Sequence, residues 1–261
     1  MPTRREARKS AERSGPLERQ ARAALAESAR TLALLEQKNA AAVAAAAELV
    51  LGCFENGGTV FFCGNGGSAA DAQHLAAEFS GRYLIDRPGL PAVALTANSS
   101  AVTAIGNDYG YDEVFARQLE GLGSPGDVLV AITTSGSSES VRRAVRAAQA
   151  LDMTVIGMTG AKGAEFAARC DVALVTPSAS TPNIQEGHIA MGHAFCLLVE
   201  RALFPHGAPV AGPRPTPRKP RGVRKRVAAA ATEAPDPASG RVPRSRGAPV
   251  RRTGPGSKAR A

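Results

Sequence analysis

The chain has 261 residues, and its 44% hydrophobic content supports at least one real core, which excludes a protein disordered throughout. Its net charge of +9 is unevenly spread: residues 208–261 hold 14 Lys and Arg against two acidic residues, so this +12 leaves −3 for the rest. No stretch approaches the roughly 18 consecutive apolar residues of a membrane span, and no apolar signal segment follows the basic N-terminus. We therefore expect a soluble, cytoplasmic protein without a membrane partner.

The four cysteines give no sign of a metal or disulfide framework. Cys53, Cys63, Cys170 and Cys196 lie far apart and form no CxxC pair. Reduced thiols are the simplest interpretation, consistent with a cytosolic protein.

The chain begins with a charged segment and a long helical one. Residues 1–16 lack periodic apolar positions, so we expect a flexible arm. Residues 17–55 are rich in Ala, Leu, Glu, Arg and Gln, contain no proline and have apolar residues at helical intervals, which predicts one long helix or two helices. Asn56, Gly57 and Gly58 are residues that end helices, because they accept the left-handed conformation.

Short apolar strands then alternate with helices. The predicted strands are 59–63, 92–95, 128–132, 154–158 and 172–176. The predicted helices are 68–80, a segment after Ser138 that runs to about 151, and about 183–203. Continuous apolar strands between helices indicate an α/β domain over 17–205, with a parallel sheet covered on both faces. Such sheets bind ligands at the carboxyl ends of their strands.

The last segment, 206–261, is rich in Pro, Arg, Ala and Gly and has no aromatic residue. It cannot bury enough apolar surface to offset its ordering entropy, so we expect a disordered basic tail. The tail is either a solvated appendage or a weak, nonspecific contact to nucleic acid or acidic surfaces. The absence of aromatic residues argues against sequence-specific RNA binding.

Two strand-to-helix junctions have the composition of anion sites. Glycines in 64–68 let the backbone approach a ligand, and hydroxyls in 133–138 precede a helix whose first N–H groups are free. Together they suggest a bound phosphate, although either could be only a turn with a helix cap. Neither is a Walker loop, while 64–69 fits a relaxed dinucleotide pattern, which alone is weak evidence.

Two helices carry candidate acid–base or metal-binding groups. His74 and Glu78 lie four residues apart, so they share a helix face and could bind a metal or transfer protons, or be an ordinary surface pair. On the last helix, His193 lies about 80° round from Gln185 and His188 about 60° the other way, at about 100° per residue. Helical geometry therefore does not choose between these two histidines.

Five blocks of sequence, taken in order, resemble one family. They are 63–68, 74–83, 106–108, 133–138 and 184–193. Over about residues 20–205 the chain is similar to the sedoheptulose 7-phosphate isomerases, or phosphoheptose isomerases, which are SIS-domain proteins. The resemblance implies a three-layer SIS-type sandwich with a five-stranded parallel sheet, a long N-terminal helical segment and a homotetramer with active sites between subunits.

The resemblance also implies residue roles. One zinc per subunit would be bound by His74, Glu78, Gln185 and His193. Substrate contacts would come from Asn65, Gly66, Gly67, Glu78, Asn107, Asp108, Thr133, Thr134, Ser135, Ser138 and Gln185. By the same resemblance His188 is structural.

The implied reaction converts sedoheptulose 7-phosphate to D-glycero-D-manno-heptose 7-phosphate through an enediol, in nucleotide-heptose precursor biosynthesis. Glu78 is the candidate base and His193 the candidate acid. Two alternatives share the scaffold: a non-catalytic SIS protein that binds the replication initiator DnaA, whose chain ending resembles Leu203-Phe204-Pro205, and a sugar-phosphate-binding regulator. These two alternatives need fewer of the catalytic groups, whereas this chain has Glu78 as well as His193.

Overall fold

The computed structural model describes residues 15–205, so the predicted tail and nearly all of the predicted N-terminal arm lie outside the described residues. The first described element is the 40-residue helix α2 (Pro16–Glu55), which confirms the long helical segment as one helix. It ends as the sequence predicts: the Asn56 side chain donates to the Gly52 carbonyl, and Gly57 has a φ of 70°.

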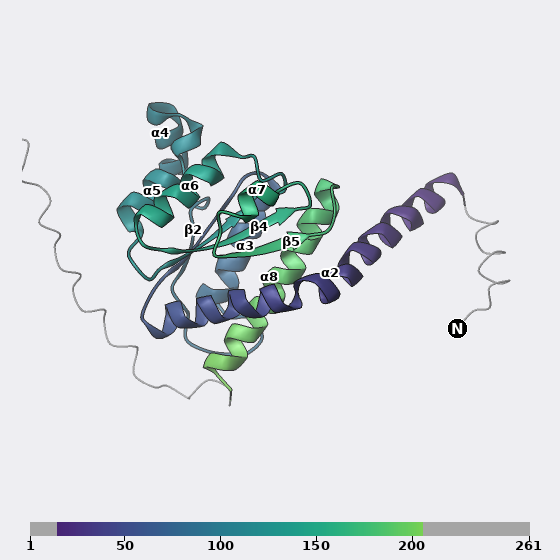
Figure 1. Ribbon diagram of the computed structural model, residues 1–261, viewed down its shortest axis with the longest axis horizontal. Coiled ribbons are helices and arrows are strands. Elements are labelled where there is room, and N and C mark those ends of the chain that lie inside the picture. Colours follow the sequence, from purple (N-terminus) through teal and green to yellow (C-terminus); the bar gives the residue numbers. More distant parts are fainter. Residues whose placement is uncertain (1–14, 206–261) are drawn as a thin grey trace, which may run out of the picture. The chain divides into compact units, whose positions relative to one another are not determined.

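Five parallel strands form one sheet in the order β2-β1-β3-β4-β5, with helices on both faces (Figure 1). Their bounds are β1 (Val60–Gly64), β2 (Ala92–Ala94), β3 (Val128–Ile132), β4 (Thr154–Gly160) and β5 (Val172–Thr176). Every residue of β1 and β3 is buried, which explains why these strands read as unbroken apolar runs. The predicted five-stranded parallel sheet is confirmed.

The helices divide between the two faces of the sheet. One apolar cluster joins the sheet to α2, α3 (Gly67–Ser80) and α8 (Thr181–Leu203). The other joins it to α5 (Ala116–Leu122), α6 (Glu139–Ala150) and α7 (Ala164–Ala167). Figure 1 shows α8 crossing α2 beneath the sheet while α6 and α7 lie above it.

A short helical region between β2 and β3 was not predicted. It consists of α4 (Ser99–Tyr109), a 3₁₀ turn η1 (Tyr111–Glu113) and α5. No residue of α4 is buried, so this helix leaves no apolar period in the sequence. The Asn98 side chain caps it by accepting from the main-chain N–H of Ala101.

The strand order changes direction between β1 and β3, since the chain runs outward to β2 on one side and to β4 and β5 on the other. The register pairs Gly64 with Ile132, so the loops that follow both strands leave the same edge side by side. Open α/β sheets bind ligands at such a switch point. This order also differs from the 3-2-1-4-5-6 order of dinucleotide-binding folds, which weakens the dinucleotide interpretation of the first loop.

Among residues 15–205, no helix combines the length and apolar character that crossing a membrane requires.

Candidate active site

The two predicted anion loops are in direct contact, and Asn65 joins them. Its side-chain amide donates to the Ser138 hydroxyl at 2.7 Å and to the Ser140 hydroxyl at 2.9 Å, while its oxygen accepts from the Tyr111 hydroxyl at 2.9 Å. The side chain of Asn65 is therefore occupied in holding the loops together. A ligand contact from this residue would have to use its main chain or displace one of these bonds.

The helices that follow the two loops begin without a side-chain cap. Gly66, which precedes α3, has no side chain, and the Ser138 hydroxyl, which precedes α6, lies 3.3 Å from the Ser140 hydroxyl but caps no main-chain N–H of α6. The first N–H groups of a helix lack partners inside the helix and carry partial positive charge, so such a helix start favours an anion. The structure thus retains the two features on which the phosphate prediction rested.

The hydroxyl groups of the second loop differ in their burial and in their hydrogen-bond partners. Thr133 is buried and its hydroxyl accepts from the Gly136 N–H. The Ser135 and Ser137 hydroxyls bond to each other at 2.8 Å and are exposed. The Thr134 main-chain carbonyl accepts a hydrogen bond from the Gly160 N–H. Ser135 is consequently the predicted contact whose hydroxyl can most readily turn to a ligand.

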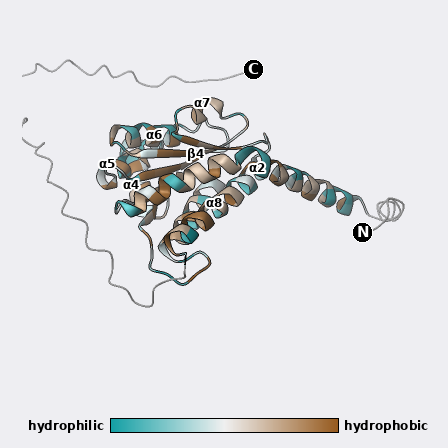
Figure 2. Cartoon of the chain, turned by 60° about the horizontal axis from the view of Figure 1, so that its bottom comes forward, coloured by the Kyte–Doolittle hydropathy of each residue, from teal (hydrophilic) through white to brown (hydrophobic). Residues whose placement is uncertain are grey.

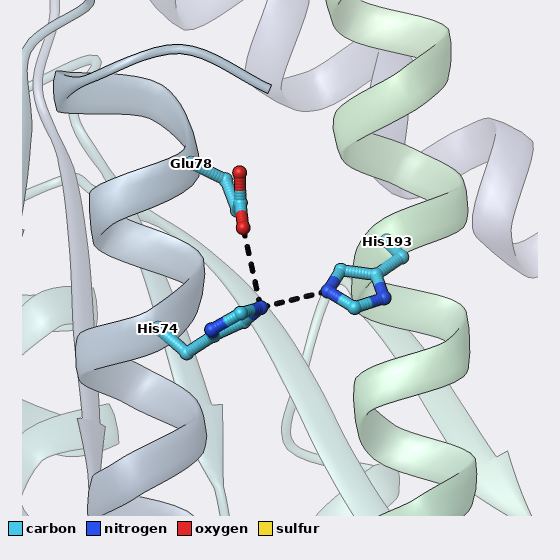
Figure 3. A group of neighbouring side chains, drawn as sticks. All are labelled: His74, Glu78 and His193. Atoms are coloured by element: carbon cyan, nitrogen blue, oxygen red, sulfur yellow. Dashed lines mark hydrogen bonds and ion pairs between the residues drawn. The ribbon is translucent and has the colours of Figure 1, made fainter. Parts of the chain in front are cut away.

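His74 and Glu78 meet His193 between α3 and α8 (Figure 3). The Nε2 atom of His74 lies 3.2 Å from Glu78 Oε1 and 2.7 Å from Nε2 of His193. The His74 side chain is 48% exposed and that of Glu78 is 19% exposed, so the cluster is open to solvent on one side. A ligand can therefore reach these three groups.

The packing of α8 distinguishes its two histidines. His193 points toward α3 and contacts His74, with ring centroids 5.0 Å apart. His188 is fully buried, and neither of its ring nitrogens has a hydrogen-bond partner within residues 15–205. Burial lowers the pKa of His188 to about 4, although the nearby Thr159 main chain opposes the shift. The neutral, enclosed ring of His188 is thus remote from any proton exchange at the cluster.

The donor set of the cluster fits a divalent metal. Two imidazole nitrogens and a carboxylate oxygen lie within 4.8 Å of one another. Such mixed N/O donors suit zinc and several other divalent metals. Two nitrogen ligands of a tetrahedral zinc are about 3.3 Å apart, so the rings of His74 and His193 must separate by roughly half an ångström to share an ion. Side-chain rotation alone can supply such a movement.

The predicted fourth ligand, Gln185, lies against the first loop. A Cβ atom at Gly67 would come within 2.1 Å of Gln185 Nε2, so the amide occupies the space that a larger residue would fill. The glycine therefore leaves this space to the Gln185 amide, a contact that the sequence pattern did not reveal. Both residues belong to the predicted site, and the structure brings them together.

Asn107 and Asp108 occupy the exposed end of α4, where the Asn107 amide donates to the Asp108 carboxylate at 2.8 Å. Within residues 15–205, neither residue shares a hydrogen bond or ion pair with the His74 cluster. Tyr111, which follows them and bonds to Asn65, was not predicted as a site residue. Its short 3₁₀ element has no apolar period that could have singled it out.

Burial shifts the pKa values of two ionisable groups beside the cluster. The pKa of Asp71 is raised by desolvation and partly restored by the charge of His74. The pKa of Tyr83 is raised by desolvation, then by electrostatic interaction with Cys196, Glu78 and Glu200. The Tyr83 ring lies 5.8 Å from the His193 ring, so it forms one wall of the cluster.

Comparison with known proteins places the chain in a family. Residues 25–160, just over half of the chain, match the SIS domain family. A phosphoheptose isomerase of Rhodospirillum rubrum is 56% identical over 164 residues, which cover 63% of this chain and 87% of the relative. The chain belongs to the phosphoheptose isomerase family of SIS-domain proteins.

Solved phosphoheptose isomerase structures share the fold. The protein from Neisseria gonorrhoeae has a TM-score of 0.67 and 48% identity, covering 70% of this chain and 98% of that one. The protein from Francisella tularensis has a TM-score of 0.69 and 36% identity, covering 72% and 100%. These two structures thus align over almost their entire length, which confirms the SIS-type sandwich with its long N-terminal helix.

Proposed function

We propose that the protein is an aldose–ketose isomerase that converts sedoheptulose 7-phosphate to D-glycero-D-manno-heptose 7-phosphate, for nucleotide-heptose biosynthesis in the cytoplasm. The observation that carries the proposal is the meeting of Glu78 and His193 with His74, in a chain from the phosphoheptose isomerase family. Two uncapped helix N-termini with their glycine and hydroxyl loops supply a place for the phosphate.

The reaction needs one base and one acid. A base removes the proton from the carbon beside the ketose carbonyl, and the resulting enediol receives the proton back at the former carbonyl carbon. Glu78 is the proposed base, and His193 moves protons at the two oxygens. The Glu78 side chain is only 19% exposed and is therefore partly shielded from water. His74 lies within hydrogen-bond distance of Glu78 and can orient its carboxylate. Each such proton transfer contributes about 10²- to 10⁴-fold in rate.

We further propose one zinc ion per subunit, held by His74, Glu78, Gln185 and His193. The nitrogen and oxygen donors of the described cluster support this assignment. When bound, the ion would polarise the substrate carbonyl or fix the carboxylate and imidazole. Substrate contacts are assigned to the two loops and to Asn107, Asp108 and Gln185. The Ser135 hydroxyl is the readiest of these, because its present partner Ser137 is also exposed.

The active oligomer is proposed to be a homotetramer with sites between subunits. A groove of about 430 Å³ lies between α2 and α8, lined mainly by leucines, alanines, Val43 and Met191. Figure 2 shows apolar stretches along both helices. The first half of α2 also exposes Leu17 and Leu25, at 80% and 71%. The chain thus offers both an apolar groove and an apolar helix face, and a second copy is the occupant that we assign to the groove.

Turnover of sedoheptulose 7-phosphate by the zinc-loaded full chain tests the proposal. Glu78→Gln should lower kcat by about 10²- to 10⁴-fold, because an amide cannot accept the proton. Glu120→Gln is the matched control: it changes an exposed carboxylate on α5, across the sheet from the cluster, and should keep the parent rate. A Glu78→Gln variant as fast as the parent would contradict the mechanism, and a parent without turnover would favour a non-catalytic SIS protein.

A further inference from the structure

A buried ion pair lies behind the candidate active site. The Arg87 Nε atom and Glu200 Oε2 are 2.8 Å apart, and the two side chains are only 1% and 3% exposed. The Glu200 carboxylate also accepts three main-chain N–H groups, from Tyr83 at 3.1 Å, Leu84 at 2.8 Å and Ile85 at 3.2 Å. Four donors therefore converge on one carboxylate of α8.

The Arg87 guanidinium directs its remaining donors to the end of α3 and to the neighbouring Pro88. It donates to the main-chain carbonyls of Glu78 at 2.7 Å, Phe79 at 3.0 Å and Pro88 at 3.1 Å. The last carbonyls of a helix have no partner within it, and a cation there interacts favourably with the helix dipole. No basic residue lies in the last turn of α3 itself, so Arg87 supplies this interaction from the following loop.

These bonds connect the two helices that carry the cluster. On α3, the guanidinium holds the main chain of Glu78, which itself belongs to the cluster. On α8, Glu200 follows His193 by seven residues, which is almost two turns and returns to nearly the same face. The loop between Arg87 and α3 contributes Tyr83, whose N–H bonds to Glu200 and whose ring lies beside His193.

Apolar packing already joins α3 to α8, for example through the Phe79 and Phe195 rings, whose centroids lie 6.0 Å apart. Apolar packing of this kind holds the two helices together but allows small shifts of one helix along the axis of the other. Burying two charges is costly and often adds little stability over apolar residues. Directional hydrogen bonds from a rigid, planar guanidinium, by contrast, fix the distance and register between their partners.

We propose that Arg87 and Glu200 are positioning residues, whose buried pair holds α3 and α8 at the separation at which His74, Glu78 and His193 can share one divalent ion. The pair touches neither substrate nor metal and acts through the Glu78 main chain and the Tyr83 ring. The inference deepens the proposed function, on which its catalytic meaning rests.

Zinc affinity of the full chain, measured by competition with a chelator, tests the inference. Arg87→Lys keeps the charge but loses the planar set of donors, and Glu200→Gln keeps the shape but loses the charge. Both should bind zinc about tenfold or more weakly, as changes behind metal ligands commonly do. With zinc saturating, both should lower kcat more than they raise KM. The measurements are made at a temperature at which circular dichroism shows that every variant is folded.

Val145→Ala is the control for a loss of stability alone. Val145 is buried on α6 against the opposite face of the sheet, so its truncation should destabilise the fold and leave zinc affinity unchanged. Parent-like zinc affinity in Arg87→Lys and Glu200→Gln, with lower melting temperatures, would assign the pair a purely structural role. If Glu200→Gln does not fold, the affinity of Arg87→Lys decides.

Different results would overturn the proposed function and the positioning role. A parent that binds zinc but does not isomerise sedoheptulose 7-phosphate overturns the proposed function, while a weaker affinity in the two variants still supports the positioning role. An active parent whose variants retain zinc affinity overturns the positioning role alone. A parent without measurable zinc affinity removes the metal site and the inference with it.

Discussion

Two histidines on α8, five residues apart, have opposite environments. His193 meets His74 at the open side of the cluster, whereas His188 is enclosed between α8 and the sheet. The buried ring has no hydrogen-bond partner among the described residues and a pKa near 4, so it is neutral when the protein is folded. In the unfolded chain the same ring has its ordinary pKa of about 6.5.

This difference predicts an acid-labile fold. Because the folded pKa lies below the unfolded one, the contribution of His188 is complete above about pH 6.5 and is lost as the pH falls toward 4. Between pH 7 and pH 5 we expect a loss of about 2 kcal/mol in the free energy of unfolding from this residue. Urea unfolding at the two pH values, with His188→Gln beside the parent, measures it. Equal losses in both proteins would contradict the assignment.

At the scale of elements, the β1–α3 loop and α8 are fitted to each other at one point. The space beside Gly67 is filled by the Gln185 amide, so a methyl group there must displace it. The amide is the far end of a flexible side chain, and its displacement strains no main chain. Stability and ligand binding can therefore be separated at this position.

Gly67→Ala should melt near the parent temperature while binding zinc about tenfold more weakly, because Gln185 is a proposed ligand. Gly121→Ala is a matched control on α5, where an added Cβ meets no atom within 4 Å. It should keep zinc affinity and stabilise the protein by up to about 1 kcal/mol, the helix advantage of alanine. Thermal melts and chelator competition measure both effects. Full zinc affinity in Gly67→Ala would argue against Gln185 as a ligand.

At the scale of the whole molecule, the α2–α8 groove governs the proposed assembly. Leu32 and Leu198 line it and are 39% and 41% exposed in the single chain. A charge buried without a partner in an interface is costly, so Leu198→Glu should shift the proposed tetramer to a smaller species. Light scattering coupled to size exclusion gives the mass.

Leu122→Glu provides the comparison for that change. Leu122 is 51% exposed at the end of α5, across the sheet from the groove, and its replacement should leave the mass unaltered. A monomeric parent, or a Leu198→Glu variant with the parent mass, would contradict the proposed assembly.

The sequence predicted the elements wherever burial leaves a pattern. Val128–Ile132 and Val172–Thr176 were predicted to the residue, because each is a mainly apolar run that follows an aspartate and precedes a threonine or a proline. The predicted helices 68–80 and 183–203 differ from α3 and α8 by one and two residues at their starts. Helix α4, the η1 turn, α5 and α7 were missed, since they are short and no residue of α4 is fully buried.

By itself, the sequence determined the parallel sheet, the two loops at its edge and the pairing of His74 with Glu78, because these follow from apolar runs and from spacing within one helix. Only the tertiary structure brought His193 rather than His188 to His74, 119 residues away, and set Gln185 against Gly67. The face that a helix turns to its neighbours depends on the packing of α8 against both α3 and the sheet. No spacing within α8 contains that information.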